Sequence, residues 1–178
     1  MKKNVFFITL FVGLVFSVFG QSESDFSYII ENTGVIITRY NGNVKDVRIP
    51  ERINGLPVIA IGNFAFEGAP MLPGMPDADG IITGVTIPNS VISIGEGAFA
   101  NNLLTSVVIP NSVTSIGKGA FVGCNRLTSV TLSRHTSIGE YAFPETARII
   151  YRDTLDDLIL DVENMSDEEF FNFLLRLF

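Results

Sequence analysis

The stretch from Leu104 to Asn125 reads LTSVVIPNSVTSIGKGAFVGCN, and the chain repeats it. A nearly identical copy, VTIPNSVISIGEGAFA, spans residues 85–100, and a more divergent copy, VTLSRHTSIGEYAF, spans residues 130–143. The Ile-Gly pairs and the Ala-Phe pairs of these three copies recur every 22 residues, and a fainter copy lies within residues 49–66. A fixed period of about 20 to 30 residues is typical of a solenoid, in which each repeat forms one coil.

The first part of the repeat predicts a short strand. Leu104, Val107 and Ile109 have the spacing at which the alternate side chains of a strand point inward, toward the core. Ser106 and Val108, which lie between them, are expected to point outward.

The rest of the repeat should carry the chain around the coil. Pro110 ends the strand because it has no N–H to donate to a ladder. Val113 and Ile116 form a second inward pair, and Gly117 is expected to take a backbone angle that a side chain would forbid. The Ala-Phe pairs close each coil, and stacking the coils predicts an internal aromatic column of Phe66, Phe99, Phe121 and Phe143.

These residues resemble the BspA-like leucine-rich repeat, a bacterial repeat with a period close to L-x-x-V-x-I-P-x-S-V-x-x-I-G-x-x-A-F-x-x-C. The resemblance covers about residues 26–151. It implies a right-handed solenoid with a parallel sheet on one face. It also implies a secreted or surface-attached protein that binds host or bacterial macromolecules and has no enzymatic activity. We therefore expect a mainly β fold of about four coils, with an N-terminal β-hairpin cap and C-terminal α-helices.

The residues before and within the solenoid divide into segments of different composition. Residues 1–20 contain two lysines and then a short apolar run, a pattern typical of a secretory signal peptide. We therefore expect export to the periplasm, the cell surface or the medium. Residues 21–46 contain two β-rich runs around a turn and should form the cap. The solenoid is expected over residues 47–151, with a Gly- and Pro-rich insertion at 67–83.

The last segment, residues 152–178, changes to a helical period. Apolar residues at i, i+3, i+4 and i+7 from Leu155, and a capping box at Ser166 and Glu169, predict two helices. Three roles remain open for their apolar side chains. They could cap the last coil, dock onto a partner or another copy of the chain, or contact a membrane. The many carboxylates of this segment argue against contact with an anionic lipid surface.

Composition and charge exclude several classes of function. The net charge of −7, or −9 without the two lysines of residues 1–20, argues against a nucleic-acid partner. The single cysteine, Cys124, cannot form an intramolecular disulfide, and its position three residues after Phe121 predicts a buried thiol. His135 is the only histidine, so a zinc site of ordinary composition cannot form; we expect this side chain at an exposed corner.

No constellation of residues indicates catalysis, a metal or a cofactor. Glu96 and Glu140 share one repeat position with Lys118 between them, which predicts a solvated column rather than an acid and a base. Asp77 and Asp79 lack the other ligands of a calcium loop. The chain also has no phosphate-binding or dinucleotide-binding motif.

The expected function is recognition of a protein partner through the repeat surface. Such a partner could be a host extracellular-matrix component or another bacterial surface protein. An alternative is a structural role in an envelope complex, joined through the apolar C-terminal helix. The outward strand residues that form the candidate face are Arg48, Thr86, Val108, Thr131, Ser106 and Ser129. Further contacts could come from Met71, Leu72 and Met75 of the insertion and from Phe171 and Phe178 of the tail. The alternative for the insertion is a tolerated loop without a binding role.

Overall fold

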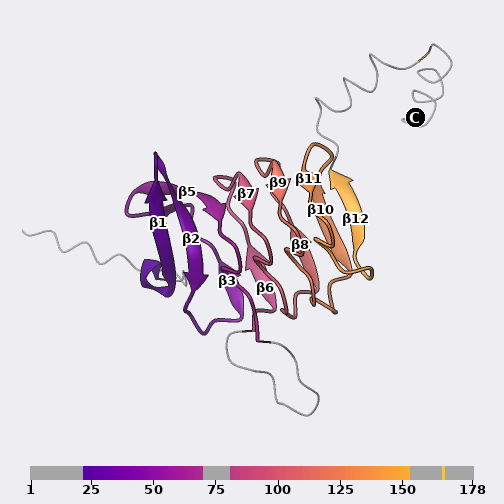
Figure 1. Cartoon of the computed structure of the whole chain (residues 1–178), viewed down its shortest axis with the longest axis horizontal. Helices are drawn as coiled ribbons and strands as arrows, with labels where there is room; N and C mark the ends of the chain where they lie inside the picture. Colours follow the sequence, from indigo (N-terminus) through magenta and orange to yellow (C-terminus); the bar gives the residue numbers. More distant parts are fainter. Residues whose placement is uncertain (1–21, 70–80, 153–165, 167–178) are drawn as a thin grey trace, which may run out of the picture.

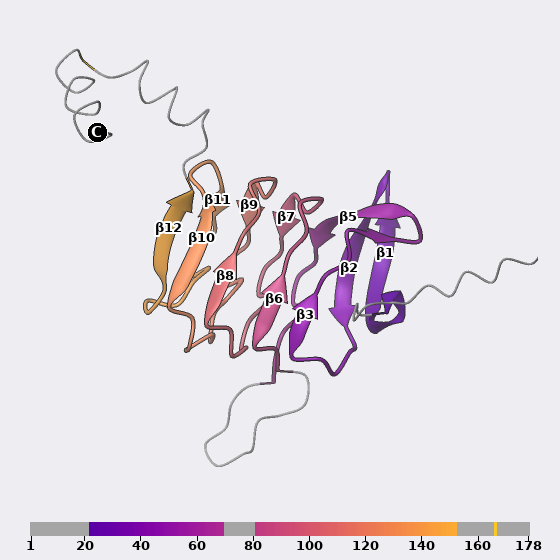
Figure 2. The ribbon, with the colours of Figure 1, turned by 180° about the vertical axis from the view of Figure 1, so that it is seen from behind.

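The computed structural model describes residues 22–69, 81–152 and 166. Figures 1 and 2 show the described chain as a stack of flat coils that advances steadily from the N-terminal hairpin to the last strand. Apart from a short 3-10 helix at Glu23–Asp25, its regular elements are all strands. The predicted β solenoid is therefore confirmed. The predicted C-terminal helices lie outside the described residues.

The predicted strands form two parallel sheets that lie side by side, and we call them together the first ladder. Its strands are β3 (Asp46–Arg48), β6 (Gly84–Thr86), β8 (Ser106–Val108), β10 (Ser129–Ser133) and β12 (Arg148–Arg152). β3 pairs with β6, and β10 pairs with both β8 and β12, all in parallel. Across the described residues the solenoid therefore makes about five turns. The expected count of four was too low because Arg148–Arg152 adds another strand after the last clear repeat.

A second ladder, which the sequence analysis did not anticipate, follows the corner of each coil. It contains β1 (Phe26–Glu31), β2 (Gly34–Tyr40), β5 (Leu56–Ile61), β7 (Ser93–Ile94), β9 (Ser115–Ile116) and β11 (Ser137–Ile138), and β4 (Arg52–Ile53) pairs with β5. β5, β7, β9 and β11 run parallel in consecutive register. The expected sheet on one face is thus joined by another, because Ile116 and its equivalents in the other coils also lie on short strands.

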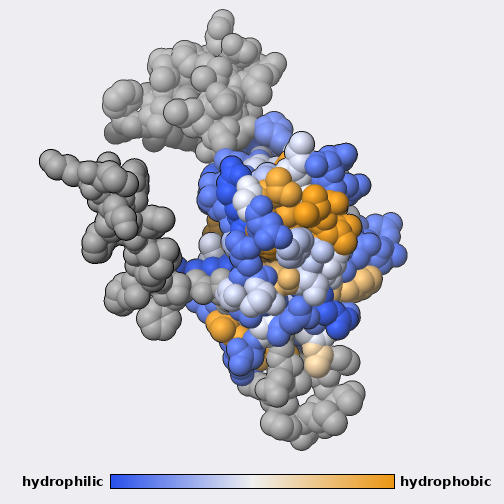
Figure 3. All heavy atoms as spheres, turned by 90° about the vertical axis from the view of Figure 1, so that its left-hand side faces the viewer, coloured by the Kyte–Doolittle hydropathy of each residue, from blue (hydrophilic) through white to orange (hydrophobic). Residues whose placement is uncertain are grey.

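The N-terminal hairpin extends this second ladder. β1 and β2 are antiparallel, and β2 pairs in parallel with β5, so the hairpin covers the edge of the first coil. Val35 and Ile37 of β2 are buried in the core. Figure 3, which views this end, shows a hydrophobic cluster within a largely hydrophilic surface. Exposed apolar side chains of β1 include Ile29 and Ile30, so the outermost strand is only partly polar.

The turns that close the coils also stack in register. The N–H of Phe99 donates to the carbonyl of Ala120 at 2.7 Å, and the N–H of Phe121 donates to the carbonyl of Ala142 at 2.7 Å. These bonds align the aromatic column that the repeat predicts. Ring centroids are 5.1, 5.1 and 5.2 Å apart along Phe66, Phe99, Phe121 and Phe143. The column is confirmed, and its spacing matches the distance of about 4.8 Å between neighbouring strands.

The glycine of each Ile-Gly pair allows this close stacking. A Cβ on Gly117 would lie 2.5 Å from the backbone nitrogen of Glu96, and one on Gly139 would lie 2.6 Å from that of Lys118. The expectation that Gly117 adopts a forbidden backbone angle was wrong, because the positive φ occurs at Gly119 (59°) instead. Gly117 is required because the backbone of the preceding coil leaves no room for a side chain.

The start of the coil after the insertion is held by a buried asparagine. The side-chain Nδ2 of Asn102 donates to the carbonyls of Phe66 and Phe99 at 2.7 and 2.9 Å, and its Oδ1 accepts from the N–H of Ile82 at 2.9 Å. Asn102 occupies the repeat position of Cys124. One side chain therefore joins Phe66, just before the insertion, to Ile82 at its end, a role that the repeat pattern does not indicate.

Removing one ring from the aromatic column should destabilise the whole stack. Phe121 is fully buried between two other rings. We expect Phe121→Ala to lower the free energy of unfolding by about 3 to 5 kcal/mol, because it leaves a cavity that rigid neighbouring coils cannot fill. Urea denaturation followed by circular dichroism would measure this. An unchanged midpoint would contradict the packing described.

Gly117 and Gly119 should respond differently to the same substitution. Gly117→Ala forces its Cβ against backbone and is expected to cost about 1 to 3 kcal/mol or more. Gly119→Ala has only ordinary contacts, 3.4 Å or longer, so its cost should be limited to the positive φ, about 1 to 2 kcal/mol. The urea midpoint of Gly117→Ala should therefore be lower than that of Gly119→Ala. The reverse ranking would show that the close contact between coils restricts the chain less than the positive φ does.

Candidate functional site

The outward side chains of the first ladder form a surface that we call the strand face. Inward residues alternate with them and are buried: Val107 is 3 % exposed and Val130 is fully buried, whereas Val108 is 51 % exposed. Because the strands pair in register, residues of equal repeat position become neighbours. The strand face is thus built by the same alternation that builds the core.

The structure brings the predicted residues together in two rows. Arg48 is the register partner of Thr86, and Val108 is the partner of Thr131. These two pairs meet where β6 and β8 contact one another without ladder pairing, and we call the four residues the first row. Ser106 pairs with Ser129 in the neighbouring row. The predicted solenoid includes β12, but its outward residues were not among the predicted contacts: Ile150, 43 % exposed, extends the first row, and Arg148 extends the second.

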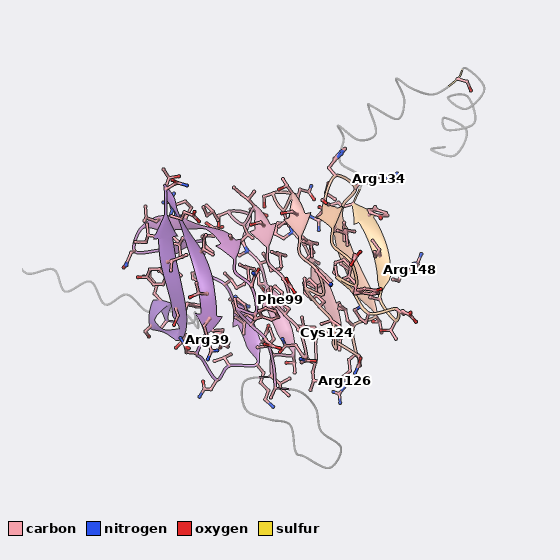
Figure 4. All side chains as sticks on the ribbon, viewed as in Figure 1. Arg39, Phe99, Cys124, Arg126, Arg134 and Arg148 are labelled. Atoms are coloured by element: carbon pink, nitrogen blue, oxygen red, sulfur yellow. The ribbon has the colours of Figure 1, made fainter. Side chains whose placement is uncertain are left out.

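The character of the strand face changes along the ladder. Its centre consists of hydroxyl and small apolar side chains, whereas charged residues lie at both ends. Asp46 and Arg48 are exposed on β3, and Arg148 and Arg152 are exposed on β12. Figure 4 shows Arg126 and Arg148 at the margin of the stack, while Phe99 and Cys124 lie inside it. The strand face therefore has a neutral centre between charged margins.

The other predicted contacts lie outside this face. Met71, Leu72 and Met75 of the insertion, and Phe171 and Phe178 of the tail, lie outside the described residues. Their predicted roles therefore stay predictions.

Cys124 is an unreactive part of the core. The thiol is fully buried, and its Sγ–H donates to the carbonyl of Phe99 at 3.1 Å. Burial raises the pKa of the Cys124 thiol to about 11, an effect partly opposed by a hydrogen bond from the backbone of Asn102. At neutral pH the thiol is therefore protonated, which argues against a nucleophilic role. The buried thiol predicted from the repeat is confirmed.

The remaining polar candidates are at the surface. His135 is exposed, as expected. Glu96, Lys118 and Glu140 form an exposed row in which Lys118 Nζ lies 3.9 Å from a carboxylate oxygen of Glu140. In the described part of the chain, no group of three or more His, Cys, Asp or Glu side chains could hold a metal ion. Among the same residues, we find no helix with the length and apolar character needed to cross a bilayer.

Structural comparison relates this fold to bacterial leucine-rich repeat proteins. The crystal structure of a leucine-rich repeat protein from T. pallidum matches with a TM-score of 0.55 and 27% identity over 75% of this chain and 71% of that chain. A leucine-rich cell surface protein of Faecalibacterium prausnitzii gives a TM-score of 0.29 and 19% identity over 67% of this chain and 55% of that chain. The pneumococcal vaccine antigen PcpA gives a TM-score of 0.46 and 18% identity over 75% of this chain and 45% of that chain.

The chain thus spans about half the length of the last two proteins. No curated protein matches the sequence. The family model described as the BspA type leucine-rich repeat region matches residues 78–172, which is more than half of the chain. This protein therefore belongs to the BspA-type leucine-rich repeat family.

Proposed function

We propose that this protein is a secreted or surface-exposed bacterial recognition module that binds a protein partner through the strand face. The observation that carries the proposal is the in-register pairing of outward residues between β3 and β6 and among β8, β10 and β12. These side chains add little to the core, since Val108 and Ile150 are 51 % and 43 % exposed. Extended surfaces of this kind are what repeat proteins use for binding.

The size of the strand face favours weak binding by each copy. The strand face consists of five strands about 4.8 Å apart, each about three residues long, so it measures roughly 20 Å across the strands and 10 Å along them. That is about 200 Å², well below the ~800 Å² that each partner contributes to a standard interface. A single copy is therefore expected to bind weakly unless neighbouring surfaces join the contact, and several copies displayed together should bind much more tightly.

The proposed partner class follows from the family and the surface. Hydroxyl and small apolar side chains at the centre suit backbone and methyl groups of a protein, and the net charge of −7 disfavours nucleic acid. A host extracellular-matrix protein or another bacterial surface protein fits this description. A location on the cell surface or outside the cell is part of the same proposal, and the signal-peptide interpretation of residues 1–20 supports it.

The alternative, assembly into an envelope complex through residues 153–178, depends on residues outside the described part of the chain. A truncation separates the two proposals. Because β12 ends at Arg152, the cut belongs after Arg152 so that the first ladder stays complete. If the strand face binds the partner, the truncated protein should retain the affinity of the full chain.

A pair of charged substitutions should disrupt the strand face without disturbing the core. We expect Val108→Asp combined with Thr131→Asp to weaken binding at least about 10-fold, because two desolvated carboxylates would occupy the centre of the contact. The measurement is surface binding of a dimerised fusion protein to a panel of purified extracellular-matrix proteins and to envelope fractions from related bacteria.

The matched control places the same charges on the second ladder. Ser115 and Ser137 are register partners on β9 and β11 and both are exposed, so Ser115→Asp with Ser137→Asp changes the net charge equally. This variant should bind within about 2-fold of the native protein. Equal losses in both variants, or binding that disappears only when residues 153–178 are removed, would refute recognition through the strand face.

A further inference from the structure

One position in each coil has a left-handed backbone, and its occupants differ between coils. The position is the second residue after the Ile-Gly pair, and it is held by Phe64, Gly97, Gly119 and Tyr141 in successive coils. Their φ angles are 56°, 56°, 59° and 54°. Glycine adopts such angles freely, whereas a bulky aromatic residue is strained there. The two central coils avoid the strain, and the two flanking coils retain it.

The retained aromatic side chains are not explained by packing in the core. Phe64 is 49 % exposed and Tyr141 is 77 % exposed, in contrast to the buried rings of the aromatic column. Strained residues that persist at a surface point to a functional constraint, because folding alone would favour glycine at both positions.

These two rings lie at the ends of a groove that we call the aromatic groove. It has a volume of about 260 Å³, and Gly97, Gly119 and Val122 line it between the two rings. The Phe64 ring lies over Gly97, since a Cβ on Gly97 would collide with that ring. Pockets that enclose a drug-sized ligand measure about 300 to 1,000 Å³. The aromatic groove therefore suits one side chain of a larger partner.

Charge selects the kind of side chain. The rim carries Glu96 and Lys118, and Lys118 is 3.9 Å from Glu140, so three charged groups near the groove sum to one negative charge. Lys118 pairs with Glu140, and among the described residues no ion pair of Glu96 is found. A partner with carboxylates would be repelled, and a neutral sugar could donate hydrogen bonds to Glu96 but would gain no attraction from the net charge.

Arginine matches both the aromatic rings and the net negative charge of the aromatic groove. Its planar guanidinium stacks on aromatic faces and pairs with a carboxylate, while its aliphatic stem contacts apolar surface. The whole chain is also acidic, with a net charge of −7. We propose that the aromatic groove binds an arginine side chain from an extended basic segment of a protein partner. This site lies on the turns that close the coils and shares no residue with the strand face.

The repeat itself supplies the test variants. Tyr141→Gly and Phe64→Gly install the residue that the central coils carry, so each removes a ring and relieves strain without altering the coil. The probe is a fluorescein-labelled peptide of three Ser-Arg-Gly units, and fluorescence anisotropy measures its affinity. Each variant should bind about 2- to 30-fold more weakly, the range of cation–π contacts, with an unchanged or higher urea midpoint.

Charge variants test the rim. Glu96→Gln should weaken binding and reduce its salt dependence, and Lys118→Gln should strengthen binding by removing a competing cation. Glu51→Gln makes the same charge change as Glu96→Gln at an exposed corner outside the aromatic groove and should have little effect. Val108→Ser, which removes an exposed apolar side chain from the strand face, should also leave peptide affinity unchanged.

A peptide with citrulline in place of arginine keeps the shape and loses the charge, so it should bind at least about 2-fold more weakly than the arginine peptide. Equal affinity for the two peptides would overturn the proposal. A folded Tyr141→Gly variant that binds the arginine peptide with native affinity would also overturn it. The same holds if a neutral trisaccharide binds the native protein more tightly than the arginine peptide does and no longer binds the Tyr141→Gly variant. These outcomes leave the strand face untouched, because its own variants are tested separately.

Discussion

The contact between successive coils is the constraint on which the rest of the structure depends. Each coil rests on the previous one at the spacing of a β-ladder, and the backbone touches so closely that the glycine of each Ile-Gly pair has no room for a Cβ. The same spacing stacks the buried phenylalanine rings at 5.1 to 5.2 Å. Hydrogen bonds between the turns, such as that from Phe99 to Ala120, keep the coils in register. A change at any of these contacts propagates along the stack, because each coil contacts mainly its neighbours.

Strict stacking also explains where recognition can occur. An inward position is restricted by packing, but an outward position adds its side chain to a row whose geometry the ladder has already determined. On the strand face this produces neighbours such as Val108 and Thr131. On the turns it produces a groove only because Phe64 and Tyr141 flank two glycines. The two surfaces therefore differ in kind. The strand face is an array with hydroxyl and small apolar side chains at its centre, and the aromatic groove is a small apolar groove with a charged rim.

The buried polar groups show how the scaffold tolerates an irregular repeat. Asn102 makes hydrogen bonds to both sides of the insertion, at a position where the next coil has Cys124 with a single bond to the Phe99 carbonyl. The asparagine satisfies backbone groups that a regular coil would pair by itself, and leaving them unpaired in the core would be costly. The insertion is therefore accommodated by one side chain, while the coils beyond it keep the same spacing.

The sequence by itself determined the period, the inward residues and the aromatic column, because these follow from alternation and repetition within one coil. It also indicated that Val108 and Ser106 face outward and that Cys124 is buried, and it placed the family. Only the tertiary structure decided that a second ladder forms, that Gly119 rather than Gly117 has the positive φ, and that Asn102 bridges the insertion. It alone brought Phe64 and Tyr141 to the same groove. The reason is physical: these features arise between coils, where backbone angles and register determine which residues meet, and spacing along one chain does not specify either.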